Sequence, residues 1–571
     1  MKKTLLIFSF FLFLQVIIQN VFCQSKEVNL KIIHTTDIHG NYFPYNFINE
    51  KPGQGSLSRV YSYVKQEREK HQVLLLDNGD ILQGQPSAYY YNFIDTNSVH
   101  LCARIMNYMG YNAASMGNHD IETGPKVYDR FVSQCGFPWL AANAMESTGE
   151  QSYFEPYYIY EIEGVKIAVL GMITPAIPAW LPKGLWPDMY FNDITSTAQK
   201  WIPYLNEKEQ PDIIVGLLHL GTDSRVTSIG IDEGGGENLA YSVPGFDIVM
   251  LGHDHRPICK KIANSVGDSV LIINPGANGN LLSEVSVSIH KGGKKQCDGK
   301  LINLSKTDPD QEFLDNFQGD YEKVLSFVSE KLAYFTKTIS SRDAYFGPSA
   351  FVDLIHQIQF SLTDADVSFA APLSFDTQIK EGDIFVSDMF KLYKYENFLY
   401  TMSLTGQEIK GFLEHSYGIW INQMNSPEDN LLLVKTGSKS EKISFVNPSY
   451  NFDSAAGISY SVDVTKPIGQ RITIQPQMAN GSNFDLNKKY RVAINSYRGN
   501  GGGGHLVDGS GIPHGGLSDR IITSTPVDLR YYIMEWMKQQ KIIEPNIISN
   551  WKLVPESWTK PAAERDYKRL F

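Results

Sequence analysis

Short apolar runs alternate with amphipathic segments along roughly the first half of the chain. The runs, rich in Leu, Ile and Val, are typical of buried strands, and the segments between them have the apolar spacing of α-helices. Alternating strands and helices predict a layered α/β domain. The predicted strands are residues 30–35, 73–77, 113–116, 165–172, 213–218 and 248–251, and the predicted helices are 57–69, 99–109 and 195–209.

The pattern changes around residues 308–339, where apolar positions recur at helical spacing among charged residues. We interpret this stretch as one long amphipathic helix that connects two domains. From about Ser341 a second domain is predicted, with a strand at 398–404 and a helix opened by the capping box Thr405-Gly-Gln-Glu408. A further helix is predicted to start at Thr525-Pro526, with Asp528 in its first turn.

The first 23 residues begin with Lys2-Lys3 and continue as an apolar run, the pattern of a secretory signal cleaved after Cys23. A membrane anchor is the alternative, but the run is shorter than the roughly 20 residues that span a bilayer, and Gln15 interrupts it. A lipid on Cys23 is disfavoured because Phe22 stands where a small residue is expected. We therefore expect an exported protein that is periplasmic, cell-surface or secreted, without a transmembrane segment.

Length, charge and cysteine content limit the possible domain organisation and the possible binding partners. A chain of 571 residues with 42% hydrophobic residues exceeds what one core serves, so two domains are expected. Loss of the signal would change the net charge from -11 to -13, and no long Lys/Arg run remains, which disfavours binding of nucleic acid polymers. The four remaining cysteines lack C-x-x-C spacing, and one or two disulfides stay open. The predicted organisation is a signal peptide (1–23), a catalytic domain (24–305), a helical connector (306–340) and a second domain (341–571).

Polar residues that suit metal binding follow several of the predicted strands. Ligands in open α/β sheets collect at the carboxyl ends of strands, so motifs far apart in sequence can share one site. A pair of divalent ions prefers carboxylate, amide and imidazole ligands, and an acidic residue can bridge both ions. Taken singly, Asp37 could be a helix cap and His219 a core histidine. Together, the candidates predict a dinuclear metal site: Asp37, His39, Asp80, Asn118, His219, His253 and His255.

Several motifs resemble a known family. His34-Thr-Thr-Asp-Ile-His-Gly-Asn41, Gly117-Asn-His-Asp120 and Gly252-His-Asp-His255 resemble the calcineurin-like metallophosphoesterases, and more closely the secreted nucleotidases that add a C-terminal nucleoside-binding domain. Tyr450-Asn-Phe-Asp453 looks like the branch of 2′,3′-cyclic-nucleotide 2′-phosphodiesterase/3′-nucleotidases. The resemblance implies an α/β fold, with a four-layer αββα metallophosphoesterase domain followed by an α+β nucleoside-binding C-terminal domain.

The resemblance also implies which residues hold two divalent ions. Zn, Mn, Co and Fe suit these nitrogen and oxygen ligands alike. One ion would be held by Asp37, His39 and His255, the other by Asn118, His219 and His253, with Asp80 bridging.

Three catalytic residues are implied in the same way. His119 would face the substrate and stabilise developing charge as an imidazolium, although a structural loop histidine is the alternative. Asn118 would also touch the phosphate. Glu122 stands where relatives have an Asp or Asn that orients the histidine.

In the second domain, the resemblance makes Tyr450 one face of an aromatic clamp on the nucleotide base, the alternative being a core tyrosine. The other face would be His505, which follows a glycine run, or its rival Tyr497. The glycines favour a binding loop over a flexible linker, because they allow close backbone approach.

The function implied is hydrolysis of 2′,3′-cyclic nucleotides to 3′-nucleotides and then to nucleoside and phosphate, with small-molecule nucleotides as substrates. A 5′-nucleotidase or nucleotide-sugar hydrolase is the first alternative. It is disfavoured because residues 371–376 lack the arginine that 5′-nucleotidases carry in the corresponding stretch. An alternative of another class is a catalytically silent nucleoside-binding or adhesion protein.

Overall fold

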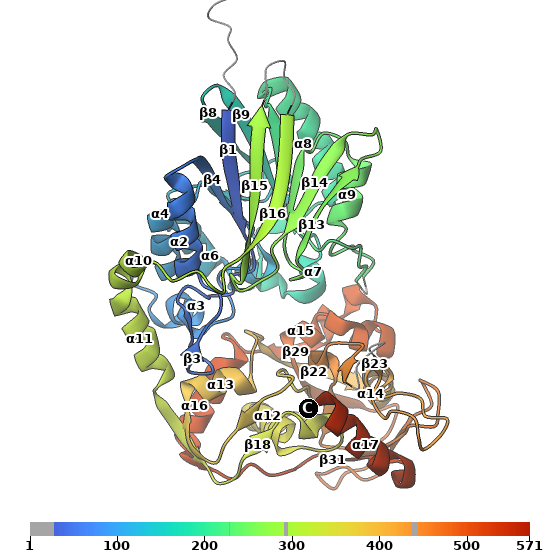
Figure 1. The fold of residues 1–571 in the computed structure, drawn as a ribbon. Coiled ribbons are helices and arrows are strands. Elements are labelled where there is room, and N and C mark those ends of the chain that lie inside the picture. Colours follow the sequence, from blue (N-terminus) through green and yellow to red (C-terminus); the bar gives the residue numbers. More distant parts are fainter. Residues whose placement is uncertain (1–27, 228, 290–294, 437–441) are drawn as a thin grey trace, which may run out of the picture.

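The computed structural model describes residues 28–227, 229–289, 295–436 and 442–571. Two domains lie one above the other in Figure 1, the first coloured blue to green and the second yellow to red. The predicted signal peptide lies outside the described residues. In the described part of the chain, no helix combines the length and apolarity that crossing a membrane requires.

Within the described residues, the first domain contains two six-stranded sheets, ordered β16-β15-β1-β4-β5-β6 and β13-β14-β12-β11-β9-β8. All six predicted strands are present, as β1 (Val28–Thr35), β4 (Gln72–Asp77), β5 (Ala113–Ser115), β9 (Val165–Ile173), β11 (Ile213–His219) and β12 (Ile248–Leu251). The other strands of these sheets are β6 (Trp139–Leu140), β8 (Tyr157–Ile162), β13 (Ile258–Ala263), β14 (Ser269–Asn274), β15 (Leu281–Ile289) and β16 (Lys295–Asn303).

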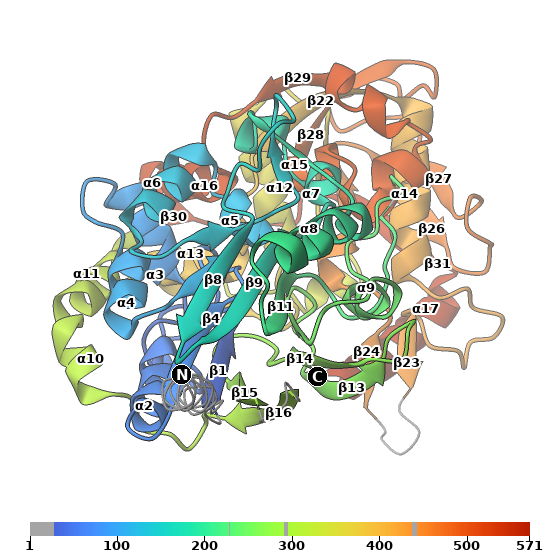
Figure 2. The same cartoon turned by 90° about the horizontal axis from the view of Figure 1, so that it is seen from above.

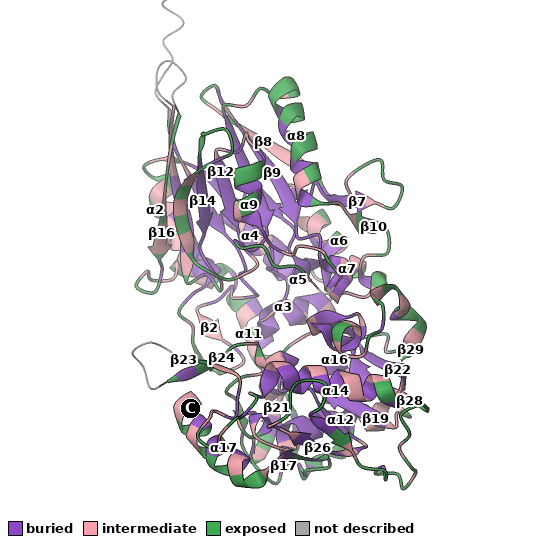
Figure 3. Cartoon of the chain, turned by 90° about the vertical axis from the view of Figure 1, so that its right-hand side faces the viewer, coloured by how far each residue is buried: buried purple, intermediate pink, exposed green. Residues whose placement is uncertain are grey.

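The two sheets pack face to face, with Leu74 and Leu76 of β4 and Val215 and Leu217 of β11 in the core between them. Both strands are buried along nearly their whole length, which explains why their sequences are continuously apolar. Figure 3 shows buried strands of the first domain, such as β9 and β12, between more exposed helices, so the predicted four-layer αββα architecture is confirmed. The covering helices are α2 (Leu57–Arg68), α4 (Leu101–Met109) and α6 (Pro125–Gln134) on one sheet, and α8 (Ile194–Lys208) and α9 (Gly236–Ser242) on the other; Figure 2 gives the same arrangement seen from above.

The connector differs from the prediction of one helix over residues 308–339. The chain forms two short helices, α10 (Gln311–Asn316) and α11 (Gln318–Val328), which descend along one side of the molecule in Figure 1. It then enters strand β17 (Lys331–Phe335), which pairs with β21 (Gly382–Phe385) of the second domain. The prediction was wrong beyond Val328 because the apolar side chains that follow pack in a sheet whose partner strand lies far along the sequence. Residues before the predicted boundary at Ser341, including those of β17, therefore belong to the second domain.

The second domain is built around a mixed sheet with helices packed on it, which confirms the predicted α+β class. The predicted strand 398–404 is its second-last strand, next to the sheet edge. In order across the sheet, the strands are β25 (Ser454–Ala456), β19 (Val367–Ala370), β28 (Lys489–Asn495), β22 (Leu399–Thr405) and β29 (Ile521–Ser524).

Two predicted helix starts have different outcomes. The capping box before α14 (Gly406–Trp420) is present: Glu408 N–H donates to Thr405 Oγ1 (3.2 Å), and Thr405 N–H donates to the Glu408 carboxylate (2.7 Å). The later helix, α16 (Leu529–Gln540), begins after the predicted position. Asp528 is its N-cap residue rather than part of its first turn, and its carboxylate accepts from Tyr531 N–H (3.2 Å).

A buried arginine joins the two domains. Tyr89, in α3 (Pro86–Tyr89) of the first domain, packs into the core of the second, and its hydroxyl donates to the Asp528 carboxylate (3.3 Å). The Arg530 guanidinium lies 4.9 Å from the centre of the Tyr89 ring and 4.3 Å from that of Phe390. Its Nη1 donates to Glu396 (2.7 Å), and both side chains are almost fully buried. This cluster fixes the second domain against the loop that follows β4.

Replacing Arg530 by alanine tests this cluster, because it leaves Glu396 as a buried carboxylate without its partner. Breaking a buried ion pair in this way costs about 3–5 kcal/mol, and urea denaturation should show a loss of that size in the free energy of unfolding. The matched control is Arg491→Ala, whose partner Asp364 is 72% exposed, because such exposed pairs contribute about 0–1 kcal/mol. Equal losses in the two variants would contradict the role given to Arg530.

Candidate active site

The seven predicted metal ligands lie at or just after the carboxyl ends of five strands. β1, β4 and β5 run parallel to one another in the first sheet, and β11 and β12 run parallel in the second. Their carboxyl ends therefore point to one edge of the domain, which is the edge that faces the second domain in Figure 1. All seven side chains come together there: Asp37 and His39 after β1, Asp80 after β4, Asn118 after β5, His219 at the end of β11, and His253 and His255 after β12.

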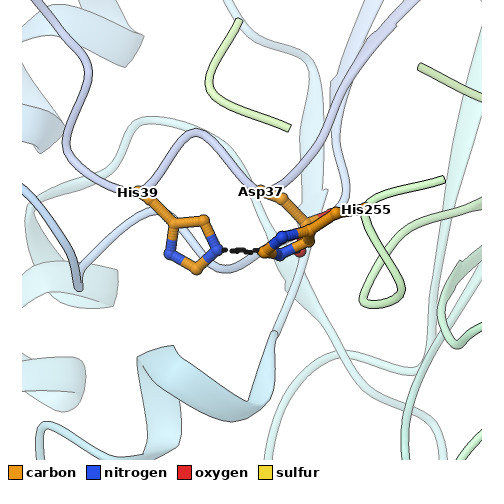
Figure 4. Close-up of side chains that lie close together, drawn as sticks. All are labelled: Asp37, His39 and His255. Carbon is orange, nitrogen blue, oxygen red and sulfur yellow. Dashed lines mark hydrogen bonds and ion pairs between the residues drawn. The ribbon is translucent and has the colours of Figure 1, made fainter. Parts of the chain in front are cut away.

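The first group of ligands is Asp37, His39 and His255. Their donor atoms all lie within 4.8 Å of one another. His255 Nε2 lies 3.1 Å from Asp37 Oδ1 and 3.0 Å from His39 Nε2, and Figure 4 shows these side chains converging. Asp37 is fully buried, whereas nearly half of the His255 side chain is exposed, so this group opens to solvent on one side.

The second group is Asp80, His219 and His253, with Asn118 beside it. The donor atoms of the first three also lie within 4.8 Å of one another. His219 Nε2 lies 3.2 Å from Asp80 Oδ2, and Asn118 Oδ1 lies 3.2 Å from His219 Nε2 and 2.8 Å from His253 Nδ1. This group is more deeply buried than the first.

The hydrogen bonds of two histidines fit metal binding. The Nδ1–H of His219 donates to the carbonyl oxygen of Asn78 (2.6 Å), and the Nδ1–H of His39 donates to that of Gln83 (3.1 Å). Each bond fixes the ring and leaves the Nε2 lone pair directed at the cluster, as metal-ligating histidines do. The donor set of carboxylate, amide and imidazole also suits divalent transition ions. The residues present therefore fit a metal pair.

The backbone of the site is strained. Five of the seven ligands have a positive φ, a conformation that non-glycine residues adopt rarely and at a cost of about 1–3 kcal/mol each. Such strain is typical of sites where the surrounding fold dictates the conformation. The residues are Asp37 (51°), His39 (49°), Asp80 (55°), His253 (66°) and His255 (56°).

Asp120 organises the loop that carries Asp80, a role that sequence reasoning missed. Its buried carboxylate accepts hydrogen bonds from the backbone N–H groups of Asp80 (2.9 Å), Ile81 (2.9 Å), Leu82 (3.0 Å) and Gly117 (2.9 Å). The available signal was an acidic residue in the first turn after a glycine, where backbone donors are free.

Trp180 is a second residue that sequence reasoning missed. It ends the short helix α7 (Ile177–Trp180), and its ring stacks on His253 with centroids 5.7 Å apart at 25°. It also lines the cavity described below. No motif marks this tryptophan in the sequence, since the contact depends on a loop from a different strand.

His119 and Glu122 form a hydrogen-bonded pair next to the second ligand group. His119 Nδ1 lies 2.5 Å from Glu122 Oε2, and the backbone N–H of His119 donates to Asp80 Oδ1 (2.8 Å). Burial lowers the pKa of His119, but the carboxylates of Asp80 and Glu122 outweigh that effect and raise it to about 9. The glutamate therefore reaches the ring that it was predicted to orient, and it favours the protonated imidazolium.

A cavity of about 960 Å³ separates the metal-ligand groups from the second domain. His119 and Glu122 line one wall. Tyr395, Tyr450 and Tyr497 line the cavity from the second domain. The Tyr450 and Tyr497 rings lie 6.4 Å apart at 82°, so they meet edge to face and do not form two parallel plates.

His505 is not part of this cavity, which corrects its prediction as a base-stacking residue. Its side chain is fully buried, its Nε2 lies 2.9 Å from the carbonyl oxygen of Asn451, and its ring packs 4.8 Å from that of Phe412. The glycine run before it is packed rather than free, because a Cβ on Gly502 would lie 2.6 Å from the Tyr497 ring. The glycine run therefore packs against Tyr497, and the imidazole of His505, which follows the run, points into the core.

Comparison with known families assigns both domains. Residues 30–257 match the calcineurin-like phosphoesterases, and residues 328–508 match the 5′-nucleotidase C-terminal domain. The chain thus combines a calcineurin-like phosphoesterase domain with a 5′-nucleotidase C-terminal domain. It is therefore a metal-dependent phosphoric ester hydrolase, and the family implies divalent metal ions at the site.

Two curated relatives match nearly the whole of this chain. A 2′,3′-cyclic-nucleotide 2′-phosphodiesterase/3′-nucleotidase of Haemophilus influenzae is 26% identical, over 94% of this chain and 89% of that protein. The trifunctional nucleotide phosphoesterase protein YfkN of Bacillus subtilis is also 26% identical over 94% of this chain. Here the match spans 39% of the relative's length, so this chain corresponds to less than half of YfkN.

Solved structures share the fold. A putative 5′-nucleotidase from Staphylococcus aureus superimposes with a TM-score of 0.76 at 20% identity, over 92% of this chain and 99% of that one. A 5′-nucleotidase precursor from Thermus thermophilus gives a TM-score of 0.63 at 20% identity, over 92% and 100% of the two chains. The arrangement of both domains is thus common to these proteins.

Gly117→Ala tests the close packing around Asp80. A Cβ at Gly117 would lie 2.2 Å from Asp80 Oδ1 and 2.3 Å from its backbone nitrogen, so the carboxylate has to move. We expect metal content, measured by mass spectrometry after dialysis against a limiting concentration of Mn²⁺, and phosphodiesterase activity to fall by about tenfold or more. Gly184→Ala is the control, because its Cβ would meet no atom within 4 Å. Unchanged metal binding in Gly117→Ala would contradict the proposed position of Asp80.

Proposed function

We propose that the chain hydrolyses 2′,3′-cyclic nucleotides to 3′-nucleotides and 3′-nucleotides to nucleoside and phosphate. The observation that carries this proposal is that His119 and ligands from both metal groups line the same cavity as Tyr450 and Tyr497. One wall can hold a phosphate while the other contacts the base. The name of the Haemophilus influenzae relative supports this choice of substrate.

The proposed cofactors are two divalent ions, with Zn, Mn, Co and Fe all compatible with the ligands. When bound, such ions polarise the phosphoryl oxygens and make a water molecule a strong nucleophile near neutral pH. The protein supplies a fixed set of donors on which the phosphate can be oriented. Asp37, His39 and His255 would hold one ion, and Asn118, His219 and His253 the other. Asp80, whose carboxylate lies beside His219, would be the ligand shared by both ions.

His119 is proposed as the general acid. Its Nδ1 is held by Glu122, so Nε2 is the nitrogen left for the substrate. In the first reaction the bond from phosphorus to O2′ breaks, and in the second the bond to O3′ breaks. Each ribose oxygen must gain a proton as it leaves, and a protonated His119 can donate it. Asn118, the neighbouring residue, is proposed to contact the phosphate as well as an ion.

Tyr450 and Tyr497 are proposed to bind the base. Because the rings stand nearly perpendicular, a base that stacks on one ring meets the edge of the other. Stacking of this kind accepts any base, since each has a π face.

We propose the regiospecificity from the finding that, among the described residues, no arginine of the second domain lines the cavity. Among the described residues, the arginines that line the cavity are Arg225 and Arg256, both from the first domain. In the stretch 371–376, Leu373 lines the cavity, whereas Asp376 faces away and pairs with Arg342 (2.6 Å). This arrangement favours cyclic and 3′-nucleotides over 5′-nucleotides.

Export from the cytoplasm is proposed on the N-terminal pattern of the sequence, whose residues lie outside the described part of the chain. A nucleotidase outside the cytoplasm would act on nucleotides before their uptake as nucleosides, without consuming the intracellular pool.

A substrate panel tests the proposed function. The purified protein is given 2′,3′-cyclic AMP, 3′-AMP and 5′-AMP with Mn²⁺ or with EDTA, and released phosphate and nucleoside are measured. We expect turnover of the first two in Mn²⁺, accumulation of 3′-AMP from the cyclic substrate, and loss of activity in EDTA. Preferential turnover of 5′-AMP would identify a 5′-nucleotidase instead. Absence of any turnover would favour a binding protein.

His119→Ala tests the general acid. We expect kcat for 3′-AMP to fall by about 10²–10⁴-fold, because the leaving oxygen loses its proton donor. Metal content should stay at the wild-type level, since His119 is not among the proposed ligands. A matched substrate with a good leaving group, p-nitrophenyl phosphate, should lose much less activity because its leaving group needs no proton. An equal loss on both substrates would contradict the proton-donor role.

A further inference from the structure

Among the described residues, three Arg or Lys side chains line the cavity, and two of them are already paired. Arg225 forms an ion pair with Glu233 (3.1 Å), and Arg256 forms one with Asp223 (2.7 Å). The third is Lys394, which follows α13 (Val386–Leu392) in the second domain.

Lys394 has no charged partner. Within the described residues its ammonium takes part in no hydrogen bond or ion pair, and it lies 5.5 Å from the centre of the Tyr395 ring. The side chain is exposed to solvent inside the cavity, yet the surrounding walls lower the pKa of the ammonium by desolvation. An unpaired cation in a concave, partly desolvated position attracts an anion more strongly than one on an open surface.

The segment that carries Lys394 faces the catalytic wall. Glu396, two residues further on, and Tyr395 both lie close enough to Glu122 for its carboxylate to raise the pKa of each group, in addition to the effect of burial. The backbone there is held firmly, because Arg530 donates to the Lys394 carbonyl oxygen (2.5 Å) and pairs with Glu396. These contacts fix the backbone position from which the Lys394 side chain extends.

We propose that Lys394 binds the phosphate group of the substrate from the second-domain wall, opposite the metal ligands, and so favours substrates according to their charge. The proposal rests on the proposed nucleotidase function. Lys394 would be the second-domain cation that contacts the phosphate, since residues 371–376 contain no lysine or arginine.

The proposal predicts a dependence on substrate charge. Near pH 8 the phosphate of 3′-AMP carries two negative charges, because its second pKa is about 6, whereas 2′,3′-cyclic AMP carries one. Coulombic attraction is proportional to the product of the charges. A lysine that contacts the phosphate should therefore contribute about twice as much free energy to binding 3′-AMP as to binding the cyclic nucleotide.

The test compares KM for 3′-AMP and 2′,3′-cyclic AMP at pH 8 in the wild type, Lys394→Met and Lys394→Arg. We expect Lys394→Met to raise KM for 3′-AMP about tenfold, and therefore KM for the cyclic nucleotide about threefold. Lys394→Arg should restore most of the loss. In Lys394→Met, the inhibition constant of inorganic phosphate should rise about tenfold, as KM for 3′-AMP does. The inhibition constant of uncharged adenosine should stay unchanged.

Lys488→Met is the matched control. Lys488 also lies over a tyrosine ring, 5.3 Å from the centre of Tyr490, but it is exposed on the surface and does not line the cavity. It should leave every constant at the wild-type value. Equal KM increases for the two nucleotides, or an equal weakening of adenosine and phosphate, would overturn the proposal.

A binding measurement separates this inference from the proposed function. If the wild type turns over neither nucleotide, the proposed function fails. Calorimetric titration of the Mn²⁺-loaded protein with inorganic phosphate then decides on Lys394, because it requires no turnover. A roughly tenfold weaker Kd in Lys394→Met, restored in Lys394→Arg, supports the phosphate contact. Equal affinities in the wild type and Lys394→Met overturn it.

Discussion

The structure depends on holding two carboxylates and four imidazoles together at the edge shared by two packed sheets. Such a cluster opposes folding, because its backbone is strained and its acidic groups repel one another. The fold compensates with a continuous apolar core between the sheets and with backbone hydrogen bonds to the buried carboxylate of Asp120. The gain expected from this arrangement is a preorganised set of metal ligands, which need not rearrange when ions bind.

The second domain completes a site that the first domain only half encloses. It contributes the tyrosines of the opposite wall and Lys394, a cation that has no charged partner among the described residues, while the first domain contributes the proposed metal ligands and His119. The cluster of Tyr89, Arg530 and Glu396 connects these functions, since it joins the domains and also supports the segment of Lys394. The same buried arginine therefore supports both the domain interface and the segment that we propose to bind phosphate.

Much of the first domain could be predicted from sequence, because strands buried on both faces appear as uninterrupted apolar runs and their ends carry the polar ligands. The connector could not, since β17 is defined by partner strands far along the chain. His505 was misread because the direction of a side chain after a glycine run depends on φ values that the sequence does not determine. Trp180 and Lys394 carry no motif at all, and tertiary contacts alone bring them to the cavity.

We propose that two ions share one site, with Asp80 as their common ligand. The most direct test is a crystal structure of the Mn²⁺-loaded protein with anomalous diffraction data that locate manganese. From this proposal we expect two peaks for each chain, one among Asp37, His39 and His255 and the other among Asn118, His219 and His253, with the Asp80 carboxylate contacting both. A single peak, or two peaks that do not share Asp80, would contradict it.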